Sequence, residues 1–474
     1  MLRSLSVLMA AGMLLVNSDV SLMAQETESE AFARPKLNPV LPQNESWYDL
    51  KGRDTQATGD LFDPIKFIPL NDDESVWLSI GGQLRTRVES WDNFGFNKNN
   101  DDTFVLSRIL LHGDLHLGEN VRVFVEGIGA FSNDRELPGL NRGLDVNQGS
   151  LQQAFVDVIL PLENIGKLTL RTGRQHLLFG SQRLVSPLPW ANTQRKWDGF
   201  SANLKTDSAD LTAFYTHFVP VKKYQFDQEE SIKFWGLFAK GAIENTGAKW
   251  NAYYFGYDRP SATFNGTTGA EERHTLGARL FGNLGDSGID YDFEGAYQFG
   301  RVGAGDVRAY MLAAEVGYKF DVKTYTPRVA MGLDIASGDD SAGGDVQTFN
   351  QLFPLGHKYL GFIDIIGRQN IIDFHQSIGV PITKKLKVSA AHHYFWRADE
   401  NDGLYNAGGG LVRAGGAGTS KKVGSEIDLT VKYAIDRHAT IQAGYSHFFA
   451  GQFIEDTGTS DDIDFAYLQF VYNF

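Results

Sequence analysis

Arginine side chains are concentrated in one stretch of the sequence, residues 170–200. This stretch contains Arg171, Arg174, Arg183 and Arg195. A guanidinium group stays charged at any physiological pH and binds a carboxylate through two parallel hydrogen bonds. These side chains therefore predict a binding wall for an anionic, carboxylate-bearing solute.

The other residues of this stretch suit a loop that folds back on itself. Pro187 and Pro189 restrict the backbone, while Trp190 and Trp197 carry flat apolar rings on which a sugar could stack. A folded surface loop whose tryptophans lie at a membrane interface explains the same residues. Both interpretations are open at the level of sequence.

The first interpretation makes a specific prediction. The loop between Gln175 and Trp197 would enter a pore, where Arg174, Arg183 and Arg195 would form part of an anion-selective constriction. Trp190 and Asp198 complete the predicted pore-lining residues of this stretch.

The elements that would hold such a pore are β-strands, because apolar and polar residues alternate from Val76 onward. Leu78, Ile80 and Leu84 share one face of the first such segment, and charged residues share the other. Counting such segments predicts about eighteen strands. An apolar outer face with a charged inner face is the pattern of an all-β, transmembrane antiparallel β-barrel.

The inner faces of the early strands add further arginines to the predicted pore lining. They are Arg85, Arg87, Arg108 and Arg122. A basic wall for an anionic solute is one explanation. The other is that a large barrel pairs its interior arginines with carboxylates to satisfy both groups. The sequence leaves these two explanations equal.

The connections between the predicted strands alternate in length. Those after even-numbered strands are short, as at 118–120 and 435–438, whereas most after odd-numbered strands are long and polar, as at 176–196, 258–271 and 337–369. The connection at 301–306 is a short exception. Short periplasmic turns and long extracellular loops produce this alternation in outer-membrane barrels.

The last segment, 463–474, ends on Phe474 and carries an apolar stripe that water would not tolerate on a free edge. Pairing with the first strand would close a ring and place this stripe against lipid. Outer-membrane lipid and the barrel assembly machinery, acting through this strand, are therefore predicted partners.

The N-terminal residues predict export. Arg3 precedes the apolar run 7–16, which is too short to span a membrane as a helix, and a small-residue cleavage site ends at Ala24. We assign the domains as follows: a signal peptide at 1–24, a proline-containing periplasmic segment at 25–74, and an outer-membrane β-barrel at 75–474. The predicted location is the bacterial outer membrane.

The composition narrows the chemistry. The chain contains no cysteine, which excludes disulfides, thiolate metal sites and cysteine nucleophiles. Its net charge of −14 excludes a generally basic protein, and no nucleic-acid partner is predicted. His112, Asp114 and His116 share a strand face, but we interpret them as polar lumen lining and predict no metal and no other cofactor.

The stretch 170–200 resembles the alginate export family of outer-membrane proteins. The matching residues are Gly173-Arg174-Gln175, then Phe179 to Leu184, then Trp190, Asn192, Arg195, Asp198 and Gly199. This resemblance implies an eighteen-stranded barrel whose electropositive pore passes an anionic exopolysaccharide, with periplasmic export components as partners. In the alginate exporter a long periplasmic turn late in the chain closes the pore, whereas the turn at 435–438 is short here.

The sequence is also compatible with other functions. A general or nutrient-selective diffusion porin is the main alternative, and a purely structural or adhesive barrel is disfavoured because eighteen strands enclose a wide channel. A barrel-embedded hydrolase is the alternative from a different class. The sequence has no Gly-x-Ser-x-Gly elbow, so no catalytic residue and no enzyme activity are predicted.

Overall fold

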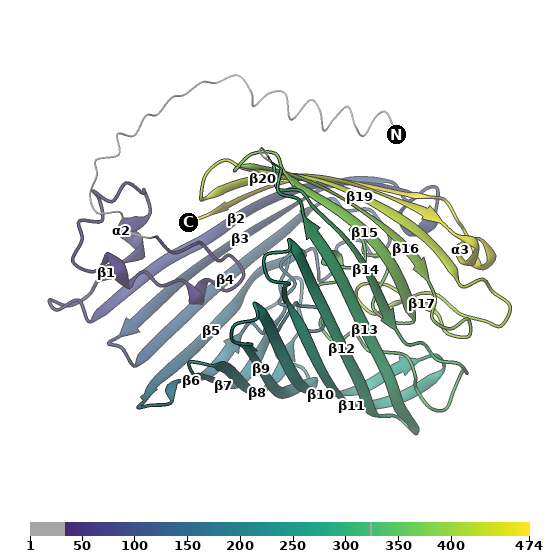
Figure 1. Cartoon of the computed structure of the whole chain (residues 1–474), viewed down its shortest axis with the longest axis horizontal. Helices are drawn as coiled ribbons and strands as arrows, with labels where there is room; N and C mark the ends of the chain where they lie inside the picture. The colour runs from purple at the N-terminus through teal and green to yellow at the C-terminus, as the bar shows by residue number, and fades with distance from the viewer. Residues whose placement is uncertain (1–33, 323–324) are drawn as a thin grey trace, which may run out of the picture.

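The computed structural model describes residues 34–322 and 325–474. Its main feature is a closed ring of eighteen antiparallel strands (Figure 1). The predicted signal peptide, residues 1–24, lies outside the described residues. Among the described residues, no helix has the length and apolar character needed to cross a membrane.

In chain order, the ring consists of β2 (Val76–Asp92), β3 (Asp102–Leu117), β4 (Val121–Asn133), β5 (Asn147–Leu162), β6 (Gly166–Gln175), β7 (Lys196–Lys205), β8 (Ala209–Val219), β9 (Lys233–Ala242), β10 (Ala248–Phe264), β11 (Thr267–Asn283), β12 (Ile289–Val302), β13 (Gly305–Lys319), β14 (Arg328–Ala336), β15 (Ile371–Pro381), β16 (Leu386–Trp396), β19 (Lys422–Ala434), β20 (Ala439–Ala450) and β21 (Ile463–Asn473). The predicted all-β barrel is thereby confirmed.

The ring closes between its first and last strands. β21 pairs antiparallel with β2, in a register that places Asn473 opposite Gln83. Beyond that pair, Gly82 and Phe474 exchange two backbone hydrogen bonds of 2.9 and 3.0 Å. No strand edge of the ring is left to be satisfied by water, which is what a sheet in lipid requires.

Side chains alternate between the two faces of the ring. On β2, Leu84 is 44% exposed, whereas its neighbour Arg85 is only 4% exposed because it points into the barrel. The same outward exposure recurs around the sheet at Ile109, Leu111, Val156, Leu237, Tyr297, Leu312, Ile378 and Val431. These side chains form the apolar band that faces lipid.

The connections follow the predicted alternation with one correction. The predicted long loop at 258–271 is wrong, because β10 and β11 continue through it to a two-residue turn. In this turn Asn265 has φ 39° and Gly266 φ 88°. Asn-Gly is the favoured pair for a hairpin turn in which both residues have positive φ. The sequence therefore carried a signal for a tight turn here, although the hydrophilic residues around it suggested a long loop.

Short elements lie within the connections and before the ring. The loops carry η3 (Phe94–Phe96), η4 (Gly356–Lys358), the small hairpin β17 (Leu404–Tyr405) and β18 (Leu411–Arg413), and α3 (Gln452–Thr457). Residues 34–74 contain η1 (Pro42–Asn44), η2 (Tyr48–Leu50), α2 (Asp63–Lys66) and β1 (Ile68–Pro69), and β1 adds to β2.

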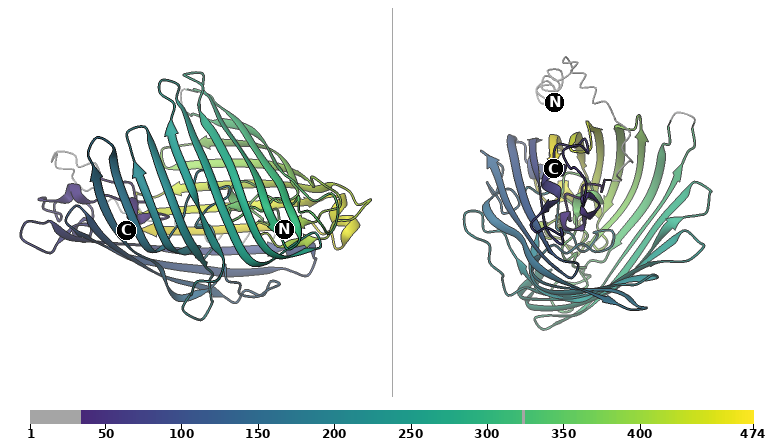
Figure 2. Two further views of the ribbon diagram at one scale, coloured as in Figure 1. Left: turned by 90° about the horizontal axis from the view of Figure 1, so that it is seen from below. Right: turned by 90° about the vertical axis from the view of Figure 1, so that its left-hand side faces the viewer.

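The N-terminal segment lies across one mouth of the barrel, as the right-hand view of Figure 2 shows. Arg122, two residues after a short turn, donates a 2.6 Å hydrogen bond to the carbonyl of Gln43. The His176 ring lies 3.0 Å from the carbonyl of Val40. Because short turns mark the periplasmic end of outer-membrane barrels, this is the periplasmic mouth. The turn at 435–438 is short as predicted, and the mouth is covered by a different part of the chain.

The lumen contains an apolar core. Two long loops, 176–195 and 337–370, turn inward and pack against aromatic side chains of the wall. From the loops come Leu177, Leu184, Val185, Phe349, Phe353, Leu360, Ile363 and Ile366, and from the wall Trp197, Phe214, Phe234, Phe255, Phe395, Phe448, Phe465 and Tyr467. The interior is therefore narrowed by packed chain and is not lined by strands alone.

A substitution at Phe474 tests how the ring closes. Its side chain lies against Gly82, where a Cβ atom would come within 2.8 Å of the ring, and its centroid is 5.2 Å from that of Phe62. Replacing Phe474 with Asp places a charge among the packed aromatic rings at the seam, so we expect a lower yield of heat-modifiable barrel in electrophoresis of outer membranes. Leu61→Asp, at a side chain that is 83% exposed, is the control. Equal yields for both variants would contradict this account of the seam.

Candidate functional site

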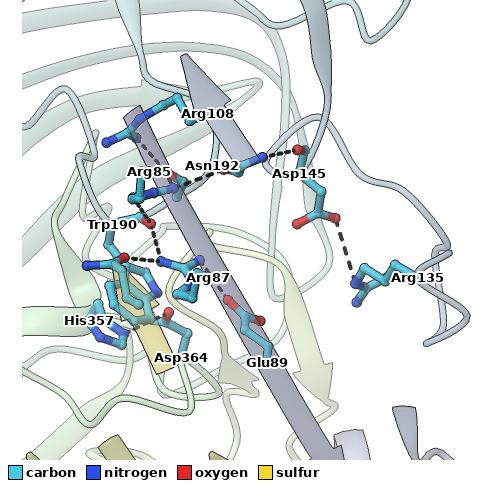
Figure 3. A network of polar contacts seen from close by, with 12 residues as sticks. Arg85, Arg87, Glu89, Arg108, Arg135, Asp145, Trp190, Asn192, His357 and Asp364 are labelled. Carbon is cyan, nitrogen blue, oxygen red and sulfur yellow. Dashed lines mark hydrogen bonds and ion pairs between the residues drawn. The ribbon is translucent and has the colours of Figure 1, made fainter. Parts of the chain in front are cut away.

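The inner loop 176–195 is held against the barrel wall through its backbone. Arg85 on β2 donates from Nη1 to the carbonyls of Pro189 and Trp190, at 2.9 and 3.0 Å, and from Nη2 to the carbonyl of Ala191 at 2.8 Å (Figure 3). Hydrogen bonds from a charged donor are among the stronger ones in proteins. One side chain thus fixes three consecutive peptide groups of the loop.

Arg108 on β3 reinforces the same attachment. Its Nη1 donates to the carbonyls of Ala191 and Pro189, at 2.9 and 3.2 Å, while Nε and Nη2 donate to the Oε1 of Gln83. Arg85 and Arg108 are directly opposite each other in the strand register, which brings both guanidinium groups to one place. The two like charges are tolerated because carbonyl dipoles surround them.

Trp190 links the two inner loops. The guanidinium of Arg87 lies 3.9 Å from its ring centroid, and the imidazole of His357 stacks on it at 3.7 Å and 11°. Because the guanidinium and the imidazole both lie this close to the Trp190 ring centroid, they occupy opposite faces of the indole ring. His357 stacks in turn on Phe362 and lies 3.1 Å from the carboxylate of Asp364. A column of rings therefore runs from the wall through loop 176–195 into loop 337–370.

This column bears on the predicted sugar-stacking role. Both faces of Trp190 are covered by protein groups, and Trp197 is completely buried. Neither ring offers a free face to a sugar in this conformation. The contacts of both tryptophans agree with a folded loop, as in the second interpretation. The loop does not lie at the membrane interface, because it folds into the barrel.

Asn192 positions the end of the anchored segment. Its amide nitrogen lies within 3.1 Å of the carbonyls of Ser107, Phe131 and Asp145, and its Oδ1 accepts from Arg85. Only 1% of the residue is exposed. A buried amide with four partners joins three wall strands, β2, β3 and β4, and a neighbouring loop to the inner loop.

Glycines in the stretch allow backbone contacts that no other residue would permit. Gly173 has φ +126°, and a Cβ there would lie 2.2 Å from the carbonyl oxygen of Ala154. Gly199, directly opposite on β7, is equally close to the carbonyl of Tyr215 at 2.3 Å. These approaches explain physically why glycine follows Asp198 and precedes Arg174 in the stretch.

Three predicted pore-lining arginines form bidentate ion pairs with carboxylates on the wall. Arg122 pairs with Asp114 at 2.6 Å for both bonds, and Arg171 with Asp157 at 2.7 and 2.8 Å. Arg174 pairs with the predicted Asp198, also at 2.7 and 2.8 Å. These three arginines therefore fit the explanation in which a large barrel pairs its interior arginines with carboxylates.

The structure does not bring Arg174, Arg183 and Arg195 to a common partner. Arg183 extends from the inner loop to β12, where Nη1 lies 2.8 Å from Glu294. Arg195 donates a 2.7 Å hydrogen bond to the carbonyl of Pro354 in loop 337–370. Arg183 and Arg195 thus attach the inner loop at two separate places, whereas Arg174 joins two wall strands, β6 and β7.

Three of the predicted arginines have no carboxylate in direct contact among the described residues. Across residues 34–322 and 325–474, no carboxylate lies within 4.0 Å of the guanidinium groups of Arg85, Arg108 and Arg195. Arg87, by contrast, forms a 2.6 Å ion pair with Glu89. The acceptors of Arg85, Arg108 and Arg195 are therefore carbonyl and amide oxygens.

Sequence reasoning did not identify the partners His357 and Asp364. A lone histidine and a loop aspartate carry no local signal, because their role follows from stacking and pairing across the lumen. His112, Asp114 and His116 have the lining role predicted for them: the His116 ring stacks on Trp77 at 3.9 Å, and Asp114 is engaged by Arg122.

The family model described as alginate export matches residues 76–466, nearly the entire ring. The chain belongs to the alginate export family. No curated protein sequence matches it significantly. The stretch that carries the resemblance, 170–200, comprises the inner loop and adjoining parts of β6 and β7 in this structure.

Solved structures share the fold. OprD of Pseudomonas aeruginosa is 14% identical, with a TM-score of 0.55, over 84% of this chain and 93% of its own. OpdO of the same organism is 13% identical, with a TM-score of 0.56, over 84% and 97%. OccK2 (OpdF), solved with glucuronate, is 12% identical, with a TM-score of 0.54, over 86% and 98%. The protein thus shares the β-barrel fold of these outer-membrane proteins.

The arginine anchor leads to a prediction for Arg85→Met with Arg108→Met. Each charged hydrogen bond contributes roughly 1.5–3 kcal/mol, so removing those to three carbonyl groups should release the 189–191 segment from the wall. We expect a higher single-channel conductance in planar bilayers. Arg171→Met is the matched control, because it removes a lumenal charge without touching the inner loop. An unchanged conductance of the folded double variant would contradict the anchoring role.

Proposed function

We propose that this protein is an outer-membrane channel that passes an anionic saccharide, as the family's description implies. The observation that carries the proposal is the group of guanidinium groups around the inner loop, Arg85, Arg108 and Arg195, which have no carboxylate within 4.0 Å in the part of the chain that the structure describes. A narrowed, positively charged lumen raises the local concentration of anions. The proposal assigns transport and no catalysis.

The chemistry of solutes bound by proteins of the same fold agrees with this proposal. OccK2 was solved with glucuronate, and OpdK, at 11% identity and a TM-score of 0.53, with vanillate. Both compounds carry a carboxylate. Identity at this level transfers only the fold, so these solutes support the class of anion and not a particular compound.

We further propose that residues 25–74 are periplasmic and that the part from 34 onward caps the barrel of residues 75–474. The contacts of Gln43 and Val40 with lumen-facing Arg122 and His176 support a cap at this mouth. Such a cap would meet any periplasmic export component first. Lipid and the barrel assembly machinery are the partners on the outer face.

A nutrient-selective diffusion porin is the second candidate. The packed apolar core contributed by loops 176–195 and 337–370 favours it, since a narrow lumen suits a small solute better than a polymer. A polymer channel would require these loops to move. The two candidates therefore differ in the length of the anion that interacts with the lumen.

Selectivity tests the charge in this proposal. The prediction for Arg174, Arg183 and Arg195 can be sharpened, because only Arg195 lacks a carboxylate partner within 4.0 Å among the described residues. Arg195→Gln should lower the ratio of anion to cation permeability, measured from reversal potentials in a salt gradient. Arg195→Lys is the control, since it keeps the charge. If the Gln variant retained wild-type selectivity, Arg195 would be structural.

Chain length of the solute separates the two candidates. For a saccharide channel, we expect uronate oligomers to block the ionic current at lower concentrations than the monomer, because several carboxylates meet several guanidinium groups at once. Block should weaken as salt rises. Neutral oligosaccharides of equal length are the control. Equal block by monomer and oligomer would favour the diffusion porin.

A further inference from the structure

The structure brings together a second group of side chains, on the opposite, later part of the wall. Asp373 and His375 follow each other on the inner face of β15, and His393 lies opposite His375 on β16. Nδ1 of His375 is 2.9 Å from Asp373 Oδ2, and Nδ1 of His393 is 3.1 Å from the same oxygen. One ligand atom from each of the three residues lies within 4.8 Å of the others.

This arrangement has the dimensions of a metal site. Zinc binds imidazole nitrogen and carboxylate oxygen at about 2.0–2.2 Å, which places neighbouring ligand atoms of a tetrahedral site about 3.4 Å apart. The observed spacings of 2.9 and 3.1 Å need to widen by only a few tenths of an ångström. Two histidines and one carboxylate are a ligand set typical of zinc and of other divalent transition metals.

A carboxylate lies beyond the second nitrogen of each histidine. Nε2 of His375 is 3.6 Å from Glu315, and Nε2 of His393 is 4.0 Å from Asp428. Metal-binding histidines commonly direct their other ring nitrogen at a carboxylate, which fixes the tautomer that leaves the first nitrogen free for the metal. Both histidines here have that second partner on the correct side.

The sheet makes room for this geometry. Gly332 on β14 is opposite His375, and a Cβ at Gly332 would lie 2.3 Å from Nε2 of that ring. The absent side chain lets the imidazole extend across β14 toward Glu315 on β13. The position of the ring is therefore built into the wall by a glycine.

Charge in the surroundings also favours a cation. Acidic groups outnumber basic ones around the cluster. The acidic groups are Glu315 on β13, Asp334 on β14, and Glu426 and Asp428 on β19; the basic ones are Arg328 on β14 and Arg368 in loop 337–370. Oε2 of Glu426 and Oδ2 of Asp428 are buried without a hydrogen-bond partner among the described residues. The other oxygen of each carboxylate accepts a hydrogen bond, from Ile363 and Ser446 respectively. A buried carboxylate oxygen without a partner is costly unless a positive charge is near.

We propose that Asp373, His375 and His393 bind one divalent transition-metal ion, with Zn²⁺ as the best fit, on the inner wall of the barrel. The three side chains supply three ligands, and a fourth position is left for water on the lumen side, where 13% of the His375 side chain is exposed. The ion would join β15 to β16 at the level of the inner loops. This site is independent of the arginines around loop 176–195 and of the proposed transport.

Titration calorimetry with Zn²⁺ tests the proposal. The full barrel is purified without a polyhistidine tag, stripped with EDTA and dialysed in detergent. We expect one ion bound per chain, and at least a tenfold weaker affinity for His375→Asn and for His393→Asn. His392→Asn is the matched control, because His392 is the neighbouring residue on the outward face of β16, where its ring centroid lies 4.1 Å from that of Tyr394.

A second measurement needs no variant. Co²⁺ bound by two imidazoles and a carboxylate in four-coordinate geometry gives an intense visible absorption that aqueous Co²⁺ lacks, and Zn²⁺ should abolish it by displacement. Absence of both Zn²⁺ binding and this absorption in the wild-type barrel would overturn the proposal. So would a loss of binding in His392→Asn equal to that in His393→Asn. The cluster would then be a hydrogen-bonded triad only.

Discussion

A guanidinium group enclosed in a barrel must have hydrogen-bond acceptors, because its charge is too costly to bury alone. Arg85 and Arg108 obtain theirs from the backbone carbonyls of 189–191. The arrangement of the interior follows from this requirement. The inner loop is drawn to the wall, Trp190 is placed over Arg87, and His357 stacks on its other face and fixes loop 337–370.

The same requirement is met differently elsewhere on the wall. Arg122, Arg171 and Arg174 each have a carboxylate within reach on the same or a neighbouring strand, so their charges are cancelled locally. The lumen is consequently uneven. Beside the inner loop, Arg85 and Arg108 meet carbonyl groups, whereas the wall around Asp373 has more carboxylates than arginines.

The ends of the chain show how a barrel and its contents stabilise each other. β21 closes the ring on β2, and Phe474 meets Phe62 of the preceding N-terminal segment. That segment also buries Trp47 and Phe67 against Trp77 at the start of β2. The seam of the ring and the cover of its periplasmic mouth are therefore parts of one packed unit.

The sequence by itself determined the number of strands, their closure, the length of most connections and the direction in which each strand residue points. These properties depend on neighbours in the chain: alternation with period two and local turn chemistry. Even the one misjudged connection, at Asn265-Gly266, carried its own signal. The resemblance within 170–200 likewise identified the family from adjacent residues.

Only the tertiary structure decided what those inward residues contact. Arg85 and Pro189 are 104 residues apart, and no pattern in the sequence indicates that a carbonyl would satisfy that arginine. His375 and His393 meet because of the register between two strands, and Trp190 meets His357 because two loops enter the same lumen. Alternation specifies the face of a strand, whereas partners across a closed interior depend on how all eighteen strands and their loops fill one volume.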